Sequence, residues 1–405
     1  MVLSKLVMAE LRRVLGFNTL LLITVNAIIG SGLFFLPAIG AAYAGPASII
    51  SWIILSAMAL YLSMCFAELV SMYPKAGGLY EFSKHSFGRF WSFIFGWTAY
   101  LVGNVTTAML IVGAIQYLLP YDSLQLKLAK LIVCLFLIWV FNILAYRGMQ
   151  TSAIMLVTFA IITISLVVLL IIAGAGYVHL SNYRPFFLYS SVWKNLKSIF
   201  IAIFFIAETF FGLESVAYLS EETKDPQKTI PKAIIYATIL IALLTITLVT
   251  VSLGVIPWTV FANSSAPFAL MGKYVWHGIF ETFIVLGTYL VIIGAAAGWI
   301  ITSPRLIMAL TRDKLFFPAF SYIHPKYHTP SKAILLQGIL SSLFVTLSFG
   351  GGYKALLSLL VPLVLIMQSA ILLSIPVLRH KEPRKTRYFK VPFGNVGPFI
   401  LLIIN

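Results

Sequence analysis

Two apolar stretches of this chain are interrupted by glycines, and these interruptions hold the residues best suited to bind a ligand. The first contains Gly30, Ser31 and Gly32, and the second contains Gly212. Glycine adopts backbone angles that other residues resist, and it lets a ligand approach the main chain closely. Inside a membrane, unwound backbone is tolerated only where it is buried in protein or lines a cavity. The two interruptions therefore predict a binding site built from main-chain groups at membrane depth.

The first interruption offers groups for both charges of an amino acid. N–H groups at the start of the outer half-helix, together with the helix dipole, favour an anion such as a carboxylate. Carbonyls that end the inner half-helix, around Ile28, suit an ammonium group. The alternative is a Gly-Ser-Gly sequence that only lets two helices pack closely. The presence of a second interruption favours the binding site.

The second interruption lies between two acidic residues in an otherwise apolar run, Glu208 and Glu214. On an unbroken helix they would point roughly 120° apart, but unwinding at Gly212 makes that angle unreliable. Ionisable groups at membrane depth are costly, and they commonly mark substrate pathways or proton relays. Either glutamate is therefore a candidate for proton coupling. The alternatives are a structural hydrogen bond from Glu214 to a neighbouring span, and a shifted sixth span that places Glu208 at the membrane interface.

The composition predicts the elements that position these groups. Of 405 residues, 60% are hydrophobic and only 10% are charged, whereas soluble domains are about 25% charged. Apolar stretches of about 20 residues, each long enough to cross roughly 30 Å of hydrocarbon, recur along the whole chain. We predict an all-α, multi-pass membrane protein with ten complete spans and a partial eleventh at 396–405. The ten spans are expected at 17–39, 46–66, 91–118, 131–147, 151–173, 198–219, 232–256, 278–303, 333–349 and 355–378.

The basic residues predict the orientation in the membrane. If the N-terminus is cytoplasmic and the spans alternate, most of the 28 Lys and Arg residues fall on the cytoplasmic side, as the positive-inside rule requires. The net charge of +16 therefore indicates topology rather than binding to nucleic acid. We expect Glu68 at the cytoplasmic face and a plasma-membrane location. A basic cluster after the tenth span is interpreted as an anchor on anionic membrane lipid: Arg379, Lys381, Arg384, Lys385, Arg387 and Lys390.

Residues for metal, redox or nucleophilic chemistry are scarce. Cys65 and Cys134 lie in or beside apolar spans, where a free cysteine packs as a small hydrophobe. No two of the six histidines share a helix face at a spacing that suits metal ligands. We therefore expect no metal, no cofactor and no enzymatic activity.

An ordered set of motifs resembles the amino acid–polyamine–organocation superfamily over essentially the whole chain. The resemblance implies a LeuT-like fold with one transporter domain over 1–405, in which spans 1–5 (17–173) and spans 6–10 (198–378) form inverted repeats. The motifs are Ile-Gly-Ser-Gly-Leu-Phe at 29–34 with Pro37, Tyr-Pro-Lys-Ala-Gly-Gly-Leu-Tyr at 73–80, Gly96-Trp97, Phe-Gly-Leu-Glu-Ser at 211–215 followed by 221–231, Arg305, Arg312-Asp313 and Pro330.

The resemblance also implies a substrate site on both interruptions. The substrate carboxylate would bind N–H groups around 31–32, and its ammonium would meet carbonyls near Ile28, Glu208 and Phe211. In the arginine/agmatine exchanger branch an aromatic gate stands at the position of Glu208, and a substrate-facing tryptophan aligns with Trp299. A carboxylate beside an aromatic face favours a cationic substrate. The predicted substrate-binding residues are Ile28, Gly30, Ser31, Gly32, Glu208, Phe211, Gly212 and Trp299.

The expected coupling follows from what is missing beside these residues. The stretch 295–299 lacks the hydroxyls of sodium-coupled relatives, and Thr163 stands about where several sodium-independent relatives have a lysine. Proton movement through Glu208 or Glu214, or obligate exchange, remains. We predict an amino acid permease or exchanger that works by alternating access, with Phe210, Phe211 and Trp299 occluding the substrate. The sequence leaves open a proton-coupled symporter of neutral amino acids, a channel, a non-transporting sensor and a partner subunit.

Overall fold

The computed structural model describes four stretches of the chain, residues 11–119, 123–276, 279–348 and 352–404. All regular structure within them is helical, apart from one isolated parallel bridge between Leu15 and Thr223. In these stretches eight continuous helical segments are long and apolar enough to cross a membrane, and α1 (Phe17–Ile28) and α13 (Ser331–Leu347) are shorter apolar helices. The all-helical, multi-pass prediction is confirmed, whereas the exact number of spans and the inverted repeat stay predictions.

The helices follow the predicted apolar stretches closely, because each stretch can satisfy its backbone groups in lipid only by forming a helix. Short helices connect or flank the long ones. The long helices are α3 (Ser48–Met72), α5 (Arg89–Leu118), α6 (Leu124–Tyr146), α7 (Met149–Ala175), α9 (Pro226–Val255), α12 (Ile279–Arg312) and α14 (Gly352–Lys381). The short ones are η1 (Gly45–Ala47), α4 (Leu79–Phe87), η2 (Leu180–Tyr183), α10 (Trp258–Ala262), α11 (Pro267–Val275), η5 (Pro318–Ser321) and α15 (Val396–Ile404).

The first predicted span is divided into two helices. α1 ends at Ile28, and α2 (Ser31–Ala44) begins after two non-helical residues. Ile29 has φ −77° and ψ 96°, although its N–H still donates to the Val25 carbonyl, and Gly30 follows with φ −119° and ψ −147°. The predicted interruption is therefore confirmed, with its centre at 29–30.

The sixth predicted span is divided as well. α8 (Val192–Ile206) passes into η3 (Ala207–Phe210), and after Gly212 the chain continues as η4 (Leu213–Glu222). Gly212 has φ +112°, which is a region that favours glycine. η4 runs for ten residues as a 3₁₀ helix, whereas such runs seldom exceed about four residues and often mark a hinge. This interruption is also confirmed.

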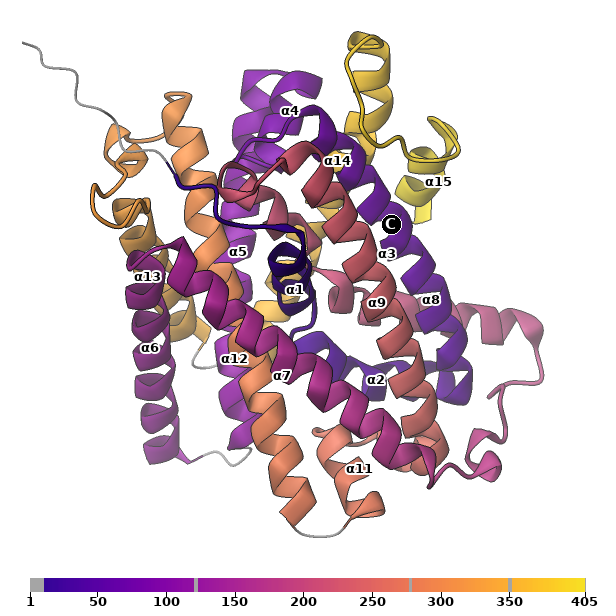
Figure 1. Ribbon diagram of the computed structural model, residues 1–405. Coiled ribbons are helices and arrows are strands. Elements are labelled where there is room, and N and C mark those ends of the chain that lie inside the picture. The colour runs from indigo at the N-terminus through magenta and orange to yellow at the C-terminus, as the bar shows by residue number, and fades with distance from the viewer. Residues whose placement is uncertain (1–10, 120–122, 277–278, 349–351, 405) are drawn as a thin grey trace, which may run out of the picture.

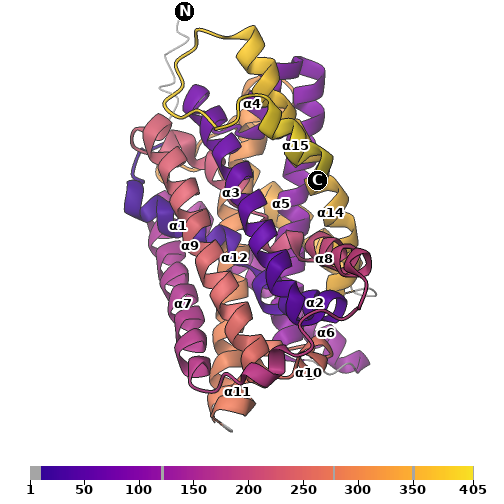
Figure 2. The same ribbon diagram turned by 90° about the vertical axis from the view of Figure 1, so that its right-hand side faces the viewer.

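The helix α1 and both interruptions lie inside the bundle. α1 is near the centre of Figure 1, where it packs against α7, α9, α12 and η4. α5 packs along α12, while α6 and α13 flank one side and α14 with α15 the other. α4 lies at one end of the molecule, and α10 and α11 lie at the opposite end (Figure 2). The bundle therefore surrounds the two interruptions with unbroken helices.

Glu68, near the end of α3, is held by two arginines of the basic cluster. Arg379 donates from Nε and Nη2 to its two carboxylate oxygens at 2.9 and 2.7 Å, and Arg387 Nε lies 3.3 Å from Oε1. The Val391 N–H donates to Glu68 Oε2 at 2.8 Å. These two arginines therefore pair with Glu68 inside the protein, and the contact of the basic cluster with anionic lipid stays a prediction. A buried carboxylate needs paired charges and hydrogen bonds, and this one draws both arginines into the protein.

Candidate functional site

The two interruptions meet face to face. A Cβ atom at Gly32 would overlap Oε2 of Glu208 and come within 2.9 Å of the Thr209 Cα. A Cβ atom at Gly212 would overlap the carbonyl oxygen of Ala27. Glycine at these two positions therefore lets the backbones of two divided spans approach each other directly. The structure brings together the predicted residues from 28 to 32 with those from 208 to 212.

Glu208 lies buried where the two interruptions meet, with 7% of its surface exposed. The Ser31 side chain hydrogen-bonds to its carboxyl group. Its Oε2 atom has no hydrogen-bond partner, and within the described residues no ion pair reaches Glu208. A buried carboxyl without a cation is costly unless it is protonated or receives a charged ligand. Glu208 is therefore enclosed by protein, and its depth in the membrane stays a prediction.

The first turn of α2 faces this carboxyl. Gly30 precedes the helix and supplies no side-chain cap, and Ser31, Gly32 and Leu33 are fully buried. The first N–H groups of a helix have no partner within the helix, and the dipole adds partial positive charge at this end. The start of α2 is therefore a buried, electropositive surface that suits an anion.

Glu214 stabilises the second interruption locally. Its Oε2 accepts a hydrogen bond from the Gly212 N–H at 3.1 Å, and the Ser215 hydroxyl donates to the Gly212 carbonyl at 2.7 Å. These bonds satisfy the main-chain N–H of the left-handed Gly212 and add to the bond that its carbonyl accepts from the Ser215 N–H at 3.1 Å. The hydrogen bond considered from Glu214 to a neighbouring span is not among the hydrogen bonds of the described residues; its bond to Gly212 lies within its own span. Its role in proton coupling stays a prediction.

Trp299 lies on α12, the helix that packs against α1. Its ring packs on α5, where a Cβ at Gly103 would lie 3.3 Å from Trp299 Cε3. On the neighbouring face of α12, Gly298 lies against Asn26, and the Asn26 amide donates to the Gly294 carbonyl at 2.8 Å. The role of Trp299 in binding substrate stays a prediction. Sequence reasoning missed Asn26, although an asparagine inside an apolar helix beside the interruption was a visible signal.

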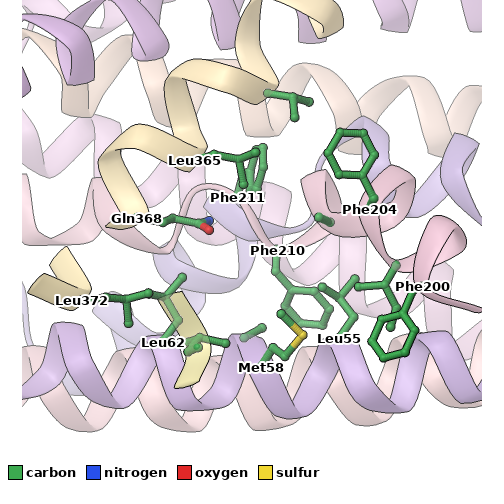
Figure 3. A pocket seen from close by; sticks show the side chains of 15 residues that line it. Leu55, Met58, Leu62, Phe200, Phe204, Phe210, Phe211, Leu365, Gln368 and Leu372 are labelled. Carbon is green, nitrogen blue, oxygen red and sulfur yellow. The ribbon is translucent and has the colours of Figure 1, made fainter. Parts of the chain in front are cut away.

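An apolar cavity of about 200 Å³ lies beside η3, among α3, α8 and α14. Phe210 and Phe211 line it together with residues of α3, α8 and α14, and Gln368 is a polar member of the lining (Figure 3). Trp299 is not among the residues that line it. The two phenylalanines therefore share a cavity that Trp299 does not border. The remaining lining residues are Leu55, Met58, Ala59, Leu62, Phe200, Ile203, Phe204, Ala207, Val361, Leu365, Leu372 and Leu401.

Two ion pairs fasten η4 to α12. Glu222 and Arg305 are fully buried and form a two-pronged pair, with Nε–Oε2 2.9 Å and Nη2–Oε1 3.0 Å. Arg305 also donates from Nη1 to the Ile301 carbonyl. Glu221 and Arg312 form a more exposed pair at 2.6 Å. The half of the sixth span that follows Gly212 is thereby held against the unbroken α12.

The stretch before α1 is held by the same end of η4. The Glu222 carbonyl accepts from the N–H groups of Val14 and Leu15 at 2.9 and 3.0 Å, and the Lys224 N–H donates to the Leu15 carbonyl at 2.9 Å. The entry to α1 and the exit of η4 are therefore joined by main-chain bonds. Any movement of η4 must involve α1.

Buried helices divided at membrane depth, with their half-helix ends turned toward one another, define a membrane transporter of small molecules. The family model "Amino acid permease" matches residues 15–404, and the chain belongs to this family. It is an integral, multi-pass membrane protein, and its relatives are transporters rather than enzymes.

Three relatives illustrate the range of the family. The branched-chain amino acid permease BcaP of Bacillus subtilis (strain 168) is 30% identical over 97% of this chain and 87% of its own length. The methylthioribose transporter of the same organism is 27% identical over 96% of this chain and 86% of its own length. Cationic amino acid transporter 4 of Mus musculus is 27% identical over 84% of this chain and 56% of its own length.

Proposed function

We propose that this protein is a secondary permease or exchanger of cationic amino acids or polyamines. The observation that carries the proposal is Glu208, a buried carboxyl without an ion-pair partner in the described residues, at the meeting point of both interruptions. A cationic group of the substrate would supply the missing charge, because a buried charge is stable only when it is paired. The same substrate class occurs in the name of one relative, the cationic amino acid transporter.

Alternating access would arise from movement of the two divided spans against the unbroken helices. α5 and α12 pack along each other, and they would form the core of the static part. η4 would move as a hinged element, because it is a long 3₁₀ helix that follows the left-handed Gly212. The ion pairs from η4 to α12 would hold one end closed, and their separation would open it. We place this end in the cytoplasm of a cell with the protein in its plasma membrane.

A proton-coupled symporter of neutral amino acids is the second candidate. The apolar cavity beside Phe210 and Phe211 favours it, because such a surface suits an aliphatic side chain. The name of the branched-chain amino acid permease among the relatives points in the same direction. In this case Glu208 would carry a proton rather than face a cationic substrate.

Flux into proteoliposomes tests the proposal. Vesicles preloaded with unlabelled amino acids and polyamines receive labelled arginine, lysine, leucine, alanine, glutamate or putrescine, with and without a pH gradient or sodium. We expect arginine, lysine or putrescine flux that requires internal substrate and is lost in Glu208→Gln. Glu281→Gln is a matched control. Glu281 lies in the first turn of α12, at the end opposite to Arg305 and Arg312, and it pairs with Lys273. Leucine flux driven by the pH gradient alone would contradict the cationic substrate and favour the second candidate.

A further inference from the structure

The Glu208 carboxyl group lies against the first turn of α2, which is the expected binding place of a substrate carboxylate. We define the carboxylate seat as the first turn of α2, residues 31–33, whose N–H groups face away from the rest of the helix. The seat is buried and has no side-chain cap from Gly30. Such a helix start attracts an anion, and in this protein the nearest anionic group belongs to the chain itself.

Two contacts of Glu208, and one of the neighbouring Thr209, place its carboxyl group against the seat. Its Oε2 atom lies directly against Gly32, and its carboxyl group receives the Ser31 side-chain hydrogen bond. The main chain of Thr209 closes the same side, because its Cα and N would lie 2.9 and 3.1 Å from a Cβ at Gly32. More than nine-tenths of the surface of Glu208 is buried, so its carboxyl group is shielded from solvent.

We propose that Glu208 is a built-in occupant of the carboxylate seat, so that the protein selects an amine without a carboxylate over the corresponding amino acid. The inference rests on the proposed function, and it names the subclass of cationic substrate. A second carboxylate at this turn would lie close to the Glu208 Oε2 atom, and the two negative charges would repel each other at short range. The unpartnered Oε2 atom, in contrast, is a ready acceptor for an ammonium or guanidinium group.

The apolar surroundings fit such a substrate. Phe210 and Phe211 follow Glu208 within three residues and are both buried. A diamine or an aminoalkylguanidine consists of a methylene chain with a cation at each end. One cation would meet Glu208, and the methylene chain would lie against apolar side chains. An amino acid of the same length adds only the carboxylate, which is the group that the occupied seat excludes.

Matched pairs of ligands test the inference. Arginine and agmatine, lysine and cadaverine, and ornithine and putrescine each differ by one carboxylate. Binding is measured with the purified full-length protein by competition against labelled agmatine and labelled arginine, and flux is measured in proteoliposomes. In the wild type we expect the amine of each pair to bind at least tenfold more tightly than the amino acid.

Three substitutions at Glu208 distinguish two effects of this side chain: its volume, which fills the seat, and its negative charge. Glu208→Ala empties the seat and is expected to reverse the preference toward the amino acid by at least tenfold. Glu208→Gln keeps the seat filled without charge, so both members of each pair should bind weakly. Glu208→Asp shortens the side chain by one methylene, which moves the carboxyl group away from the seat. This variant should have a smaller preference for the amine over the amino acid than the wild type. Glu281→Gln is the control for expression and folding, and it should keep the wild-type ratio.

Each outcome decides between the two proposals. Tighter binding of arginine than agmatine by the wild type overturns the built-in occupant and leaves the cationic transporter standing. An unchanged ratio in both Glu208→Ala and Glu208→Asp overturns it as well. If no cationic ligand of either kind binds, both proposals fail. Should Glu208→Ala not fold, the wild-type ratio and Glu208→Asp still decide the question.

Discussion

Breaking the buried ion pair between Glu222 and Arg305 is expected to release η4 from α12. Both side chains are fully buried, and two hydrogen bonds of 2.9 and 3.0 Å join them. Removing one partner of a buried pair leaves an uncompensated charge and costs about 3–5 kcal/mol. That penalty applies to the state in which η4 is docked. Since about 1.4 kcal/mol is a factor of ten, Glu222→Leu should shift the docking equilibrium by roughly a hundredfold or more.

The assay follows the accessibility of a buried position on η4. In a background with Cys65 and Cys134 replaced by alanine, Ser220→Cys places a single thiol on the buried side of η4. The rate of alkylation by a water-soluble maleimide reports the undocked population. Glu222→Leu should raise this rate by about a hundredfold, within the limit set by the fully open state.

A double variant and a surface control make the reasoning refutable. Glu222→Leu combined with Arg305→Met removes both charges. The double variant should recover most of the docking free energy that Glu222→Leu alone loses, because apolar groups of similar volume often replace a buried pair at little cost. The more exposed pair of Glu221 and Arg312 is a control in the same two helices, and Arg312→Met should cost less than about 1 kcal/mol. Additive effects of the two single variants, or equal effects at the buried and exposed pairs, would refute the argument.

Three further substitutions probe other parts of the molecule. Gly32→Val should abolish ligand binding, because its side chain would overlap Glu208 and the Thr209 main chain; wild-type affinity in a binding assay would disprove the meeting of the two interruptions. Gly212→Ala should lower the melting temperature and the flux, because φ is +112° and a Cβ would overlap a carbonyl; an unchanged melting temperature would contradict this. Partial burial of Asp313 opposes its ionisation, but hydrogen bonds from Lys84 and Tyr80 outweigh that effect and lower its pKa. Its contribution to stability is therefore present above about pH 4 and lost as the pH falls through the lowered pKa, so melting curves of Asp313→Asn and the wild type should converge in acid; a constant difference would refute it.

The helices and both interruptions could be predicted from the sequence because their causes are local. A run of about 20 apolar residues must be helical in lipid, and glycines at 30, 32 and 212 mark where it is not. The 3₁₀ winding of η4 had no such signal, since residues 213–222 carry no pattern that separates it from an α-helix.

The pairings across the bundle could not be predicted. Glu222 and Arg305 are 83 residues apart, and only the packing of η4 on α12 brings them together. Glu68 and Arg379 are 311 residues apart, so the sequence shows a basic cluster but not its partner. The placement of Glu208 against Gly32 depends in the same way on how two divided spans meet. Polar residues at membrane depth could be recognised singly, whereas their partners required the tertiary structure.

A structure of the protein with its best-bound cationic ligand would test the central claim most directly. We predict that the ligand lies between residues 27–32 and 208–212, with a cationic group within hydrogen-bond distance of the Glu208 carboxyl. A ligand seated instead in the apolar cavity among α3, α8 and α14, with Glu208 and Gly32 still in contact, would contradict it.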